Sequence, residues 1–178
     1  MRKIVLTFGL LAGAVLSATM LLSTLFWDHI GFDKGMYVGY TSMVLAFLMV
    51  WFGVRSYRDN AAGGRVSFVR AFVVGLLITL VASSCYVATW EVIYYNVSPD
   101  FMDKYSAYAI DQAKKSGASD AKLAQIRKEM ADATAMYKNP LVNVAMTLLE
   151  PLPVGLLFTL VTAVAMSRRR RVGEPAVA

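Results

Sequence analysis

Two glutamates stand inside long apolar stretches of this sequence, where an ionised side chain is costly. Glu91 lies about one helical turn from the end of its stretch, and Glu150 lies about ten residues inside another, which is on the order of 13–15 Å of helix. A carboxylate at that depth must face other protein groups, face water or be protonated. Asp28 and His29 end a further apolar stretch at the same level. We therefore expect Asp28, His29, Glu91 and Glu150 to form one polar cluster.

This cluster offers two kinds of chemistry. Converging carboxylates and an imidazole could take a proton, a cation or a small ligand. Alternatively, Glu150 has a structural role and accepts hydrogen bonds from the third apolar stretch, which provides Tyr86, Thr89, Trp90 and Tyr94. A metal site would use the same four cluster residues. A single histidine without ligand spacing supports it only weakly, so we expect neither a metal nor a cofactor.

Four apolar stretches must position these side chains. They cover residues 4–26, 36–54, 70–95 and 141–166. Each approaches or exceeds the roughly 20 residues that a helix needs to cross a hydrocarbon core. Hydrophobic residues form 57% of the chain and charged residues 17%, whereas soluble domains contain about 25% charged residues. We therefore expect an all-α polytopic membrane protein with four transmembrane helices, the fourth kinked near Glu150 by Pro151 and Pro153.

The basic residues predict the orientation of the chain. They gather at the N-terminus, between spans two and three, and in the tail at 168–178, which we expect to be disordered. Those expected to contact lipid headgroups are Arg55, Arg58, Arg65, Arg70, Arg168 and Arg169. Only Lys34 lies between spans one and two. Since short loops rich in Lys and Arg stay in the cytoplasm, we expect both termini to be cytoplasmic in a bacterial inner membrane.

This charge distribution also bears on partners and on processing of the chain. The net charge of +6 reflects membrane orientation, with the lipid bilayer as the partner and no nucleic acid. The basic, apolar start resembles a signal peptide, but its apolar run is too long for a cleaved one, and we expect it to remain as the first span.

The charged segment 96–140 falls on the outer side of the membrane by alternation. Helix starts are predicted at Ser98 and Ser119, a stop at Gly117 and a break at Asn139-Pro140. We expect a periplasmic helical hairpin with helices near 99–116 and 120–138. The residues expected to face apolar surroundings are Phe101, Tyr105, Ile126 and Met130. These apolar faces either pack against each other and the membrane surface or dock another protein.

Small residues recur four positions apart in two spans. Gly9 and Gly13 form one such pair, and Gly35 and Gly39 form another at the start of span two. Such pairs let helix backbones approach closely. We expect them to serve the internal bundle, with a homodimer as the alternative. The single cysteine, Cys85, lies in span three, so no internal disulfide forms.

Motifs distributed over nearly the whole chain resemble a known family. They are Phe52-Gly53, Tyr57-Arg58-Asp59, Gly63-Gly64, Phe68, Gly75, Tyr86, Trp90, and Glu150 with Pro153-Val154-Gly155. This set is similar to the bacterial domain-of-unknown-function family 4199 (DUF4199). The resemblance implies a four-span inner-membrane protein and brings no activity with it.

The sequence contains no catalytic motif of the hydrolase, kinase, nucleotide-binding or redox type. We therefore expect a non-enzymatic accessory or scaffold protein whose partner is another membrane protein or a second copy of the chain. The alternative is a small transporter or channel component that uses Glu91 and Glu150. A membrane-embedded enzyme comes third, with the Asp28, His29, Glu91 and Glu150 cluster as its basis.

Overall fold

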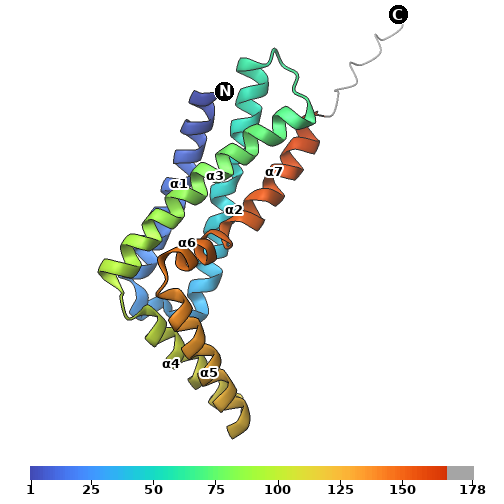
Figure 1. Cartoon of the computed structure of the whole chain (residues 1–178). Helices are drawn as coiled ribbons and strands as arrows, with labels where there is room; N and C mark the ends of the chain where they lie inside the picture. Colours follow the sequence, from blue (N-terminus) through green and yellow to red (C-terminus); the bar gives the residue numbers. More distant parts are fainter. Residues whose placement is uncertain (168–178) are drawn as a thin grey trace, which may run out of the picture.

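The computed structural model describes residues 1–167, except for the side chains of residues 27–29. Every regular element in this range is helical. The elements are α1 (Arg2–Leu25), α2 (Trp27–Ala61), α3 (Phe68–Val92), the π-helix η1 (Ile93–Val97), α4 (Phe101–Lys115), α5 (Asp120–Tyr137), α6 (Pro140–Leu148) and α7 (Pro151–Ser167) (Figure 1). The predicted tail at 168–178, with Arg168 and Arg169, lies outside the described residues.

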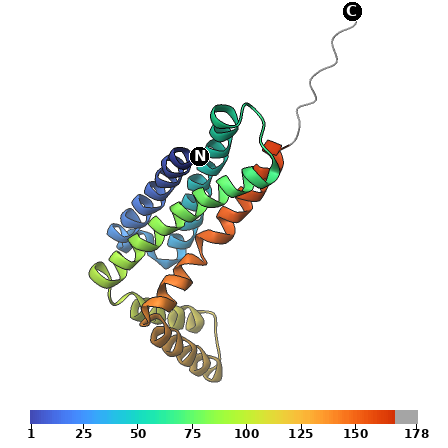
Figure 2. The same cartoon turned by 45° about the horizontal axis from the view of Figure 1, so that its top comes forward.

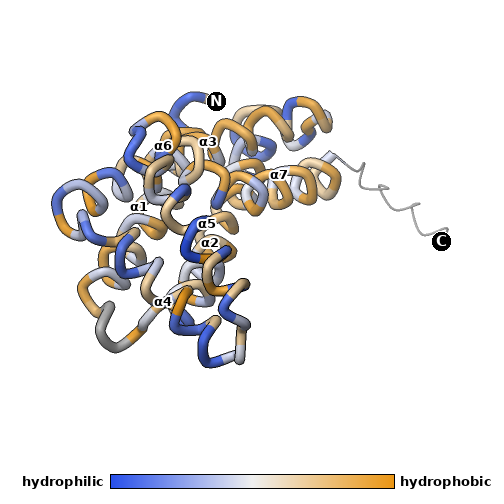
Figure 3. The backbone as a smooth tube through the Cα atoms, turned by 60° about the horizontal axis from the view of Figure 1, so that its bottom comes forward, coloured by the Kyte–Doolittle hydropathy of each residue, from blue (hydrophilic) through white to orange (hydrophobic). Residues whose placement is uncertain are grey.

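Four of these segments are long and apolar enough to span a membrane. They are Arg2–Leu25, Ile30–Ala61, Phe68–Val97 and Pro140–Ser167. The prediction of an all-α, four-span fold is therefore confirmed. In Figure 3 the hydrophobic colours run along α3 and α7, whereas hydrophilic colours mark much of α4.

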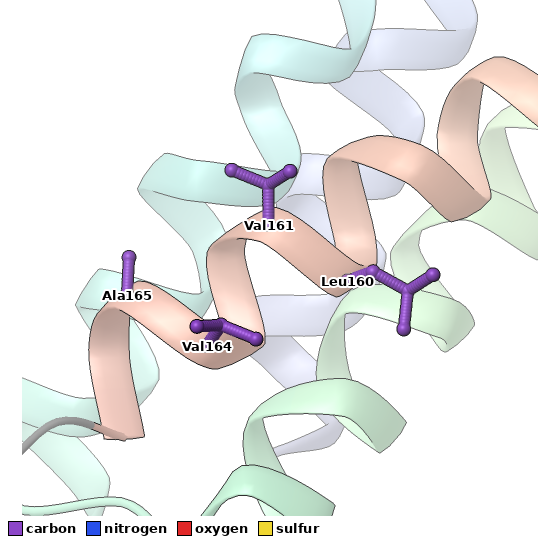
Figure 4. Close-up of a pocket in the computed structure, with 4 residues that line it drawn as sticks. All are labelled: Leu160, Val161, Val164 and Ala165. Carbon is purple, nitrogen blue, oxygen red and sulfur yellow. The ribbon is translucent and has the colours of Figure 1, made fainter.

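The outer surface of the bundle is apolar. Leu10, Leu45 and Leu157 are 53%, 55% and 60% exposed on three different helices. On α7, the apolar side chains of Leu160, Val161, Val164 and Ala165 line a shallow depression (Figure 4). A soluble monomer rarely exposes so much apolar surface, whereas lipid tails solvate it well.

Helix α3 holds the bundle together, because it packs against α1, α2 and α7 (Figures 1 and 2). A Cβ added at Gly13 would lie 2.6 Å from Cys85 Cβ, and one at Gly9 would lie 2.7 Å from Val81 Cβ. The Gly9/Gly13 pair therefore serves the internal bundle, as predicted. Gly39 of the second pair makes no such contact, since a Cβ there would meet nothing within 4 Å.

The connection between spans one and two differs from the expected loop. Helix α2 begins at Trp27, and only Phe26 separates it from α1. The change of direction is made at Phe26 and inside α2, where Gly31 has a φ of 63° and a ψ of 175°. Positive φ is easily adopted by glycine, so the chain turns there while the flanking residues keep helical hydrogen bonds.

Helices α4 and α5 lie side by side at the end of the bundle opposite the N-terminus and the end of α7 (Figures 1 and 2). Ser119 caps α5 as predicted, since its Oγ accepts from Lys122 N–H at 3.3 Å. The predicted Ser98 cap of α4 is wrong. Asp100 occupies the cap position, and Ser98 instead accepts the Phe101 N–H through its backbone carbonyl at 3.0 Å. The periplasmic location of these helices remains a prediction.

Candidate functional site at the break in the fourth span

The fourth span is broken where the sequence predicts a kink. Helix α6 ends at Leu148 and α7 begins at Pro151, so Leu149 and Glu150 form a turn. In that turn the N–H of Glu150 donates to the Thr147 carbonyl at 3.4 Å, one residue short of the helical pattern. Proline has no N–H and clashes with the preceding helical turn, which explains the break. Glu150 therefore belongs to neither α6 nor α7.

Glu150 faces span three. Its Oε2 accepts a hydrogen bond of 2.6 Å from the Tyr86 hydroxyl. Tyr40 of α2 and Tyr137 of α5 lie close enough to Tyr86 to interact with it electrostatically. The expected pairing of Glu150 with an aromatic side chain of span three is thus present, and Tyr137 of α5 lies close enough to the carboxylate to interact with its charge.

Glu150 also lines an open cavity of about 1340 Å³ between the ends of the spans and the α4–α5 pair, where the lining residues Tyr37 and Leu149 are 70% and 62% exposed. Its polar and aromatic lining includes Ser23, Thr24, Phe32, Asp33, Tyr37, Tyr40, Tyr86, Trp90, Phe101, Lys104, Tyr105, Tyr108, Tyr137 and Glu150. Leucine and methionine side chains complete the wall, among them Leu16, Met20, Met43 and Met146. We call this cavity the chamber. It combines a large apolar surface with few charged groups, as small-molecule sites do.

A second polar group supports the wall of the chamber from behind. Asn143 of α6 is fully buried, and its Oδ1 accepts from Trp90 Nε1 at 3.0 Å and from Thr147 Oγ1 at 3.3 Å. Its Nδ2 has no hydrogen-bond partner among the described residues. The hydrogen bond from Trp90 ties α6 to α3, directly before the break. Sequence reasoning missed Asn143, although Asn143 and Thr147 are spaced as one helix face that leads to Glu150.

Glu91 does not join Glu150 at the chamber. It is absent from the chamber's lining, and its Oε1 is buried without a partner among the described residues. The side chains of Asp28 and His29 lie outside the described residues. Within the described part of the chain, no three His, Cys, Asp or Glu residues are placed to hold a metal ion. The structure therefore brings Glu150 to the chamber with tyrosines rather than with Glu91.

Helix α4 forms one wall of the chamber. Phe32 of α2 packs against the rings of Phe101, Tyr105 and Tyr108, with centroid distances of 5.8, 5.3 and 4.9 Å. The Tyr108 hydroxyl donates to Asp33, and this hydrogen bond raises the pKa of the Tyr108 phenol. The expected apolar surroundings of Phe101 and Tyr105 are thus provided by span two.

The arginines expected at lipid headgroups lie at the opposite end of the bundle. Arg55 and Arg58 contact Asp59 at 3.6 and 2.7 Å, and Arg58 also donates to Met166 Sδ at 3.2 Å. Arg65 and Arg70 are exposed around the start of α3. Their contact with headgroups remains a prediction.

Comparison with known proteins agrees with the motifs in the sequence. A family model described as "Protein of unknown function (DUF4199)" matches residues 7–168. No curated protein and no solved structure matches the chain. With nearly its whole length matched, the chain belongs to the DUF4199 family of proteins of unknown function.

Proposed function

We propose that this protein is a non-enzymatic accessory protein of the bacterial inner membrane that binds a small amphipathic molecule in the chamber. The observation that carries the proposal is the placement of Glu150. A carboxylate at a helix break opens onto a cavity of about 1340 Å³ whose other walls are largely aromatic and aliphatic. Broken spans in membrane proteins commonly line such sites, because irregular backbone is tolerated only against protein or a cavity.

The packing beyond the chamber favours binding over conduction. Phe47, Val50 and Ile78 are fully buried in the half of the bundle nearer the N-terminus. There the Thr79 hydroxyl lies 3.3 Å from the Gly155 carbonyl and 3.1 Å from the Thr159 hydroxyl. A pore would have to pass through these contacts. The absence of Glu91 from the chamber's lining further weakens a path that uses both glutamates.

The proposed orientation places both termini in the cytoplasm and α4 and α5 in the periplasm. The N-terminus and the connection between α2 and α3, which carries Arg65, lie at one end of the bundle (Figure 1). The positive-inside tendency assigns that end to the cytoplasm. Alkaline phosphatase fused after Ser116 should be active, and the same enzyme fused to the C-terminus should be inactive. The reverse pattern would overturn this orientation.

The binding proposal is tested by filling the chamber. A Cβ on Gly39 meets nothing within 4 Å and Gly39 lines the chamber, so Gly39→Phe should fit and occupy it. Val44 lies on the same helix, is 45% exposed and does not line the chamber, so Val44→Phe is the matched control. Native mass spectrometry of the purified full chain should show bound amphiphiles in the wild type and in Val44→Phe, and their loss in Gly39→Phe.

Two results would contradict the proposal. Equal amounts of bound amphiphile in Gly39→Phe and Val44→Phe would show that the chamber is not the site. Recovery of a chemically altered amphiphile after incubation with the protein would overturn the non-enzymatic role.

A further inference from the structure

We infer that the molecule in the chamber carries an organic cation, an ammonium group on an apolar chain, and that Glu150 with Tyr40, Tyr86 and Tyr137 receives that group. This inference rests on the proposed binding function and adds the chemical class of the ligand. Three features of the chamber support it: the unmatched carboxylate, the aromatic side chains around it and the size of the apolar wall.

Among the described residues, Glu150 has no basic partner. Tyr86 donates to one oxygen of Glu150, and the other oxygen accepts nothing from the described residues. Among the described residues that line the chamber the basic side chain is Lys104, and its Nζ is paired with Asp100 at 2.9 Å. A carboxylate inside a membrane protein is stabilised by a positive charge. The chamber leaves that charge to be supplied by a ligand.

The aromatic surroundings select for a particular kind of cation. Tyr40 and Tyr137 lie near Tyr86, and the Trp90 ring lines the same chamber. Ring faces attract ammonium groups, and several rings around one acid form the usual site for alkylated amines. A phosphate or a carboxylate would meet Glu150 and Asp33 and be repelled. The lining therefore favours positively charged ligands over negatively charged ones.

The remaining wall suits an apolar chain. Leu16, Met20, Met43 and Met146 come from three segments of the bundle and line the chamber. Methionine adapts to irregular apolar partners. At about 1340 Å³ the chamber exceeds the roughly 300–1,000 Å³ of ordinary ligand sites, so a long chain fits beside the head group.

The experiment compares three probes of equal chain length: decyltrimethylammonium, decanol and decanoate. Their binding to the purified full chain in a neutral detergent is measured by native mass spectrometry. Decyltrimethylammonium should bind about tenfold more tightly than decanol, and decanoate should bind more weakly than decanol. Glu150→Gln keeps the shape and the hydrogen bond to Tyr86, so it should remain folded and lose the tenfold preference. Glu129→Gln is the control and should keep the preference, because Glu129 is an exposed residue of α5 that does not line the chamber.

A second arm identifies the natural source of the ammonium group. Nanodiscs of phosphatidylethanolamine and of phosphatidylglycerol supply ammonium-bearing and anionic lipids, and lipids retained by the protein are counted in each. Retention of phosphatidylethanolamine that is lost in Glu150→Gln would identify a lipid headgroup. Preference for decyltrimethylammonium without such retention would identify a free amphiphilic amine.

The outcomes separate this inference from the proposed function. Equal binding of the three probes, or a cation preference that survives in folded Glu150→Gln, would overturn the cation inference and leave ligand binding intact. Failure of every probe and every lipid to bind would overturn both. If Glu150→Gln melts at a lower temperature than the wild type, Tyr40→Leu replaces it, since Tyr40 is 54% exposed and supplies a ring to the same site. A wild-type preference in Tyr40→Leu would then overturn the inference.

Discussion

The contact between α1 and α3 predicts that two glycines of the same motif type respond oppositely to alanine. Gly13 faces α3, and a Cβ there would lie 2.6 Å from Cys85 Cβ and 2.7 Å from its Sγ. Gly39 in α2 has nothing within 4 Å of the corresponding position. Gly13→Ala therefore forces α1 away from α3, whereas Gly39→Ala only adds a methyl group to open space.

The difference in stability follows from these distances. Real Cβ contacts are not shorter than 3 Å, so the Gly13 site must expand, and such overpacking costs about 1–3 kcal/mol. Replacing glycine by alanine within a helix gains up to about 1 kcal/mol of helix propensity, and this gain applies to both sites. This gain therefore does not contribute to the difference in stability between the two variants. Gly13→Ala should consequently be less stable than Gly39→Ala by about 1–3 kcal/mol.

The assay is reversible unfolding of the purified protein in mixed detergent micelles, followed by tryptophan fluorescence. Cys85→Gly removes both of the atoms that Gly13→Ala would strike, so in that background the two alanine variants should become equally stable. Equal stability of the two variants in the wild-type background would refute the α1–α3 packing described here. A difference that persists in the Cys85→Gly background would assign the effect to something other than Cys85.

Three further predictions concern polar groups. Asn143→Ala removes the buried acceptor of two hydrogen bonds and should destabilise the protein by about 1–2 kcal/mol in the same unfolding assay. An unchanged unfolding midpoint would contradict the placement of Asn143. Ser119→Ala should lower hydrogen-exchange protection at the start of α5 by about 1 kcal/mol, while Ser98→Ala should leave α4 unchanged; equal effects would contradict the two cap assignments. The hydrogen bond to Asp33 raises the pKa of Tyr108 in the folded state. Its contribution to the stability of the fold is therefore present below the ordinary tyrosine pKa of about 10, and it is lost as the pH rises through the pKa of the folded state. Exchange of α4 should therefore accelerate more steeply above that pH in the wild type than in Tyr108→Phe, and identical pH profiles would argue against this hydrogen bond.

The sequence was informative where one local property decides the structure. Apolar length predicted the four spans, and the two prolines predicted the break at Glu150, because each effect acts within a few residues. The Ser119 cap and the Gly117 stop, with its φ of 77°, are local in the same sense. The Ser98 cap failed because Asp100, two residues later, took the cap position, and single-sequence patterns do not resolve competing starts so close together.

The candidate site was less predictable, because it depends on contacts between distant segments. Tyr108 meets Asp33 across 75 residues, and Tyr86 meets Glu150 across 64. The sequence predicted Tyr86 as one of several possible partners for Glu150. It did not show how the third and fourth spans align, which decides the partner. The sequence likewise could not show that Glu91 is absent from the residues that line the chamber, because this depends on how α3 packs against the other helices. Asn143 was not predicted because its hydrogen bond from Trp90 joins residues 53 apart and depends on how α6 packs against α3.

The central claim, that Glu150 opens onto a ligand chamber, is tested most directly by the chemical accessibility of that position. Cys85 is the chain's single cysteine, so Cys85→Ala gives a thiol-free background. In it, Glu150→Cys should react with a water-soluble alkylthiosulfonate carrying a trimethylammonium group, and saturating decanol, whose binding does not need the carboxylate, should slow that reaction. Thr159→Cys, at a fully buried position beyond the chamber, should stay unreactive in the folded protein. Both variants should melt at the same temperature as the Cys85→Ala background. If the Glu150→Cys thiol is then as unreactive as that of Thr159→Cys, Glu150 does not open onto the chamber.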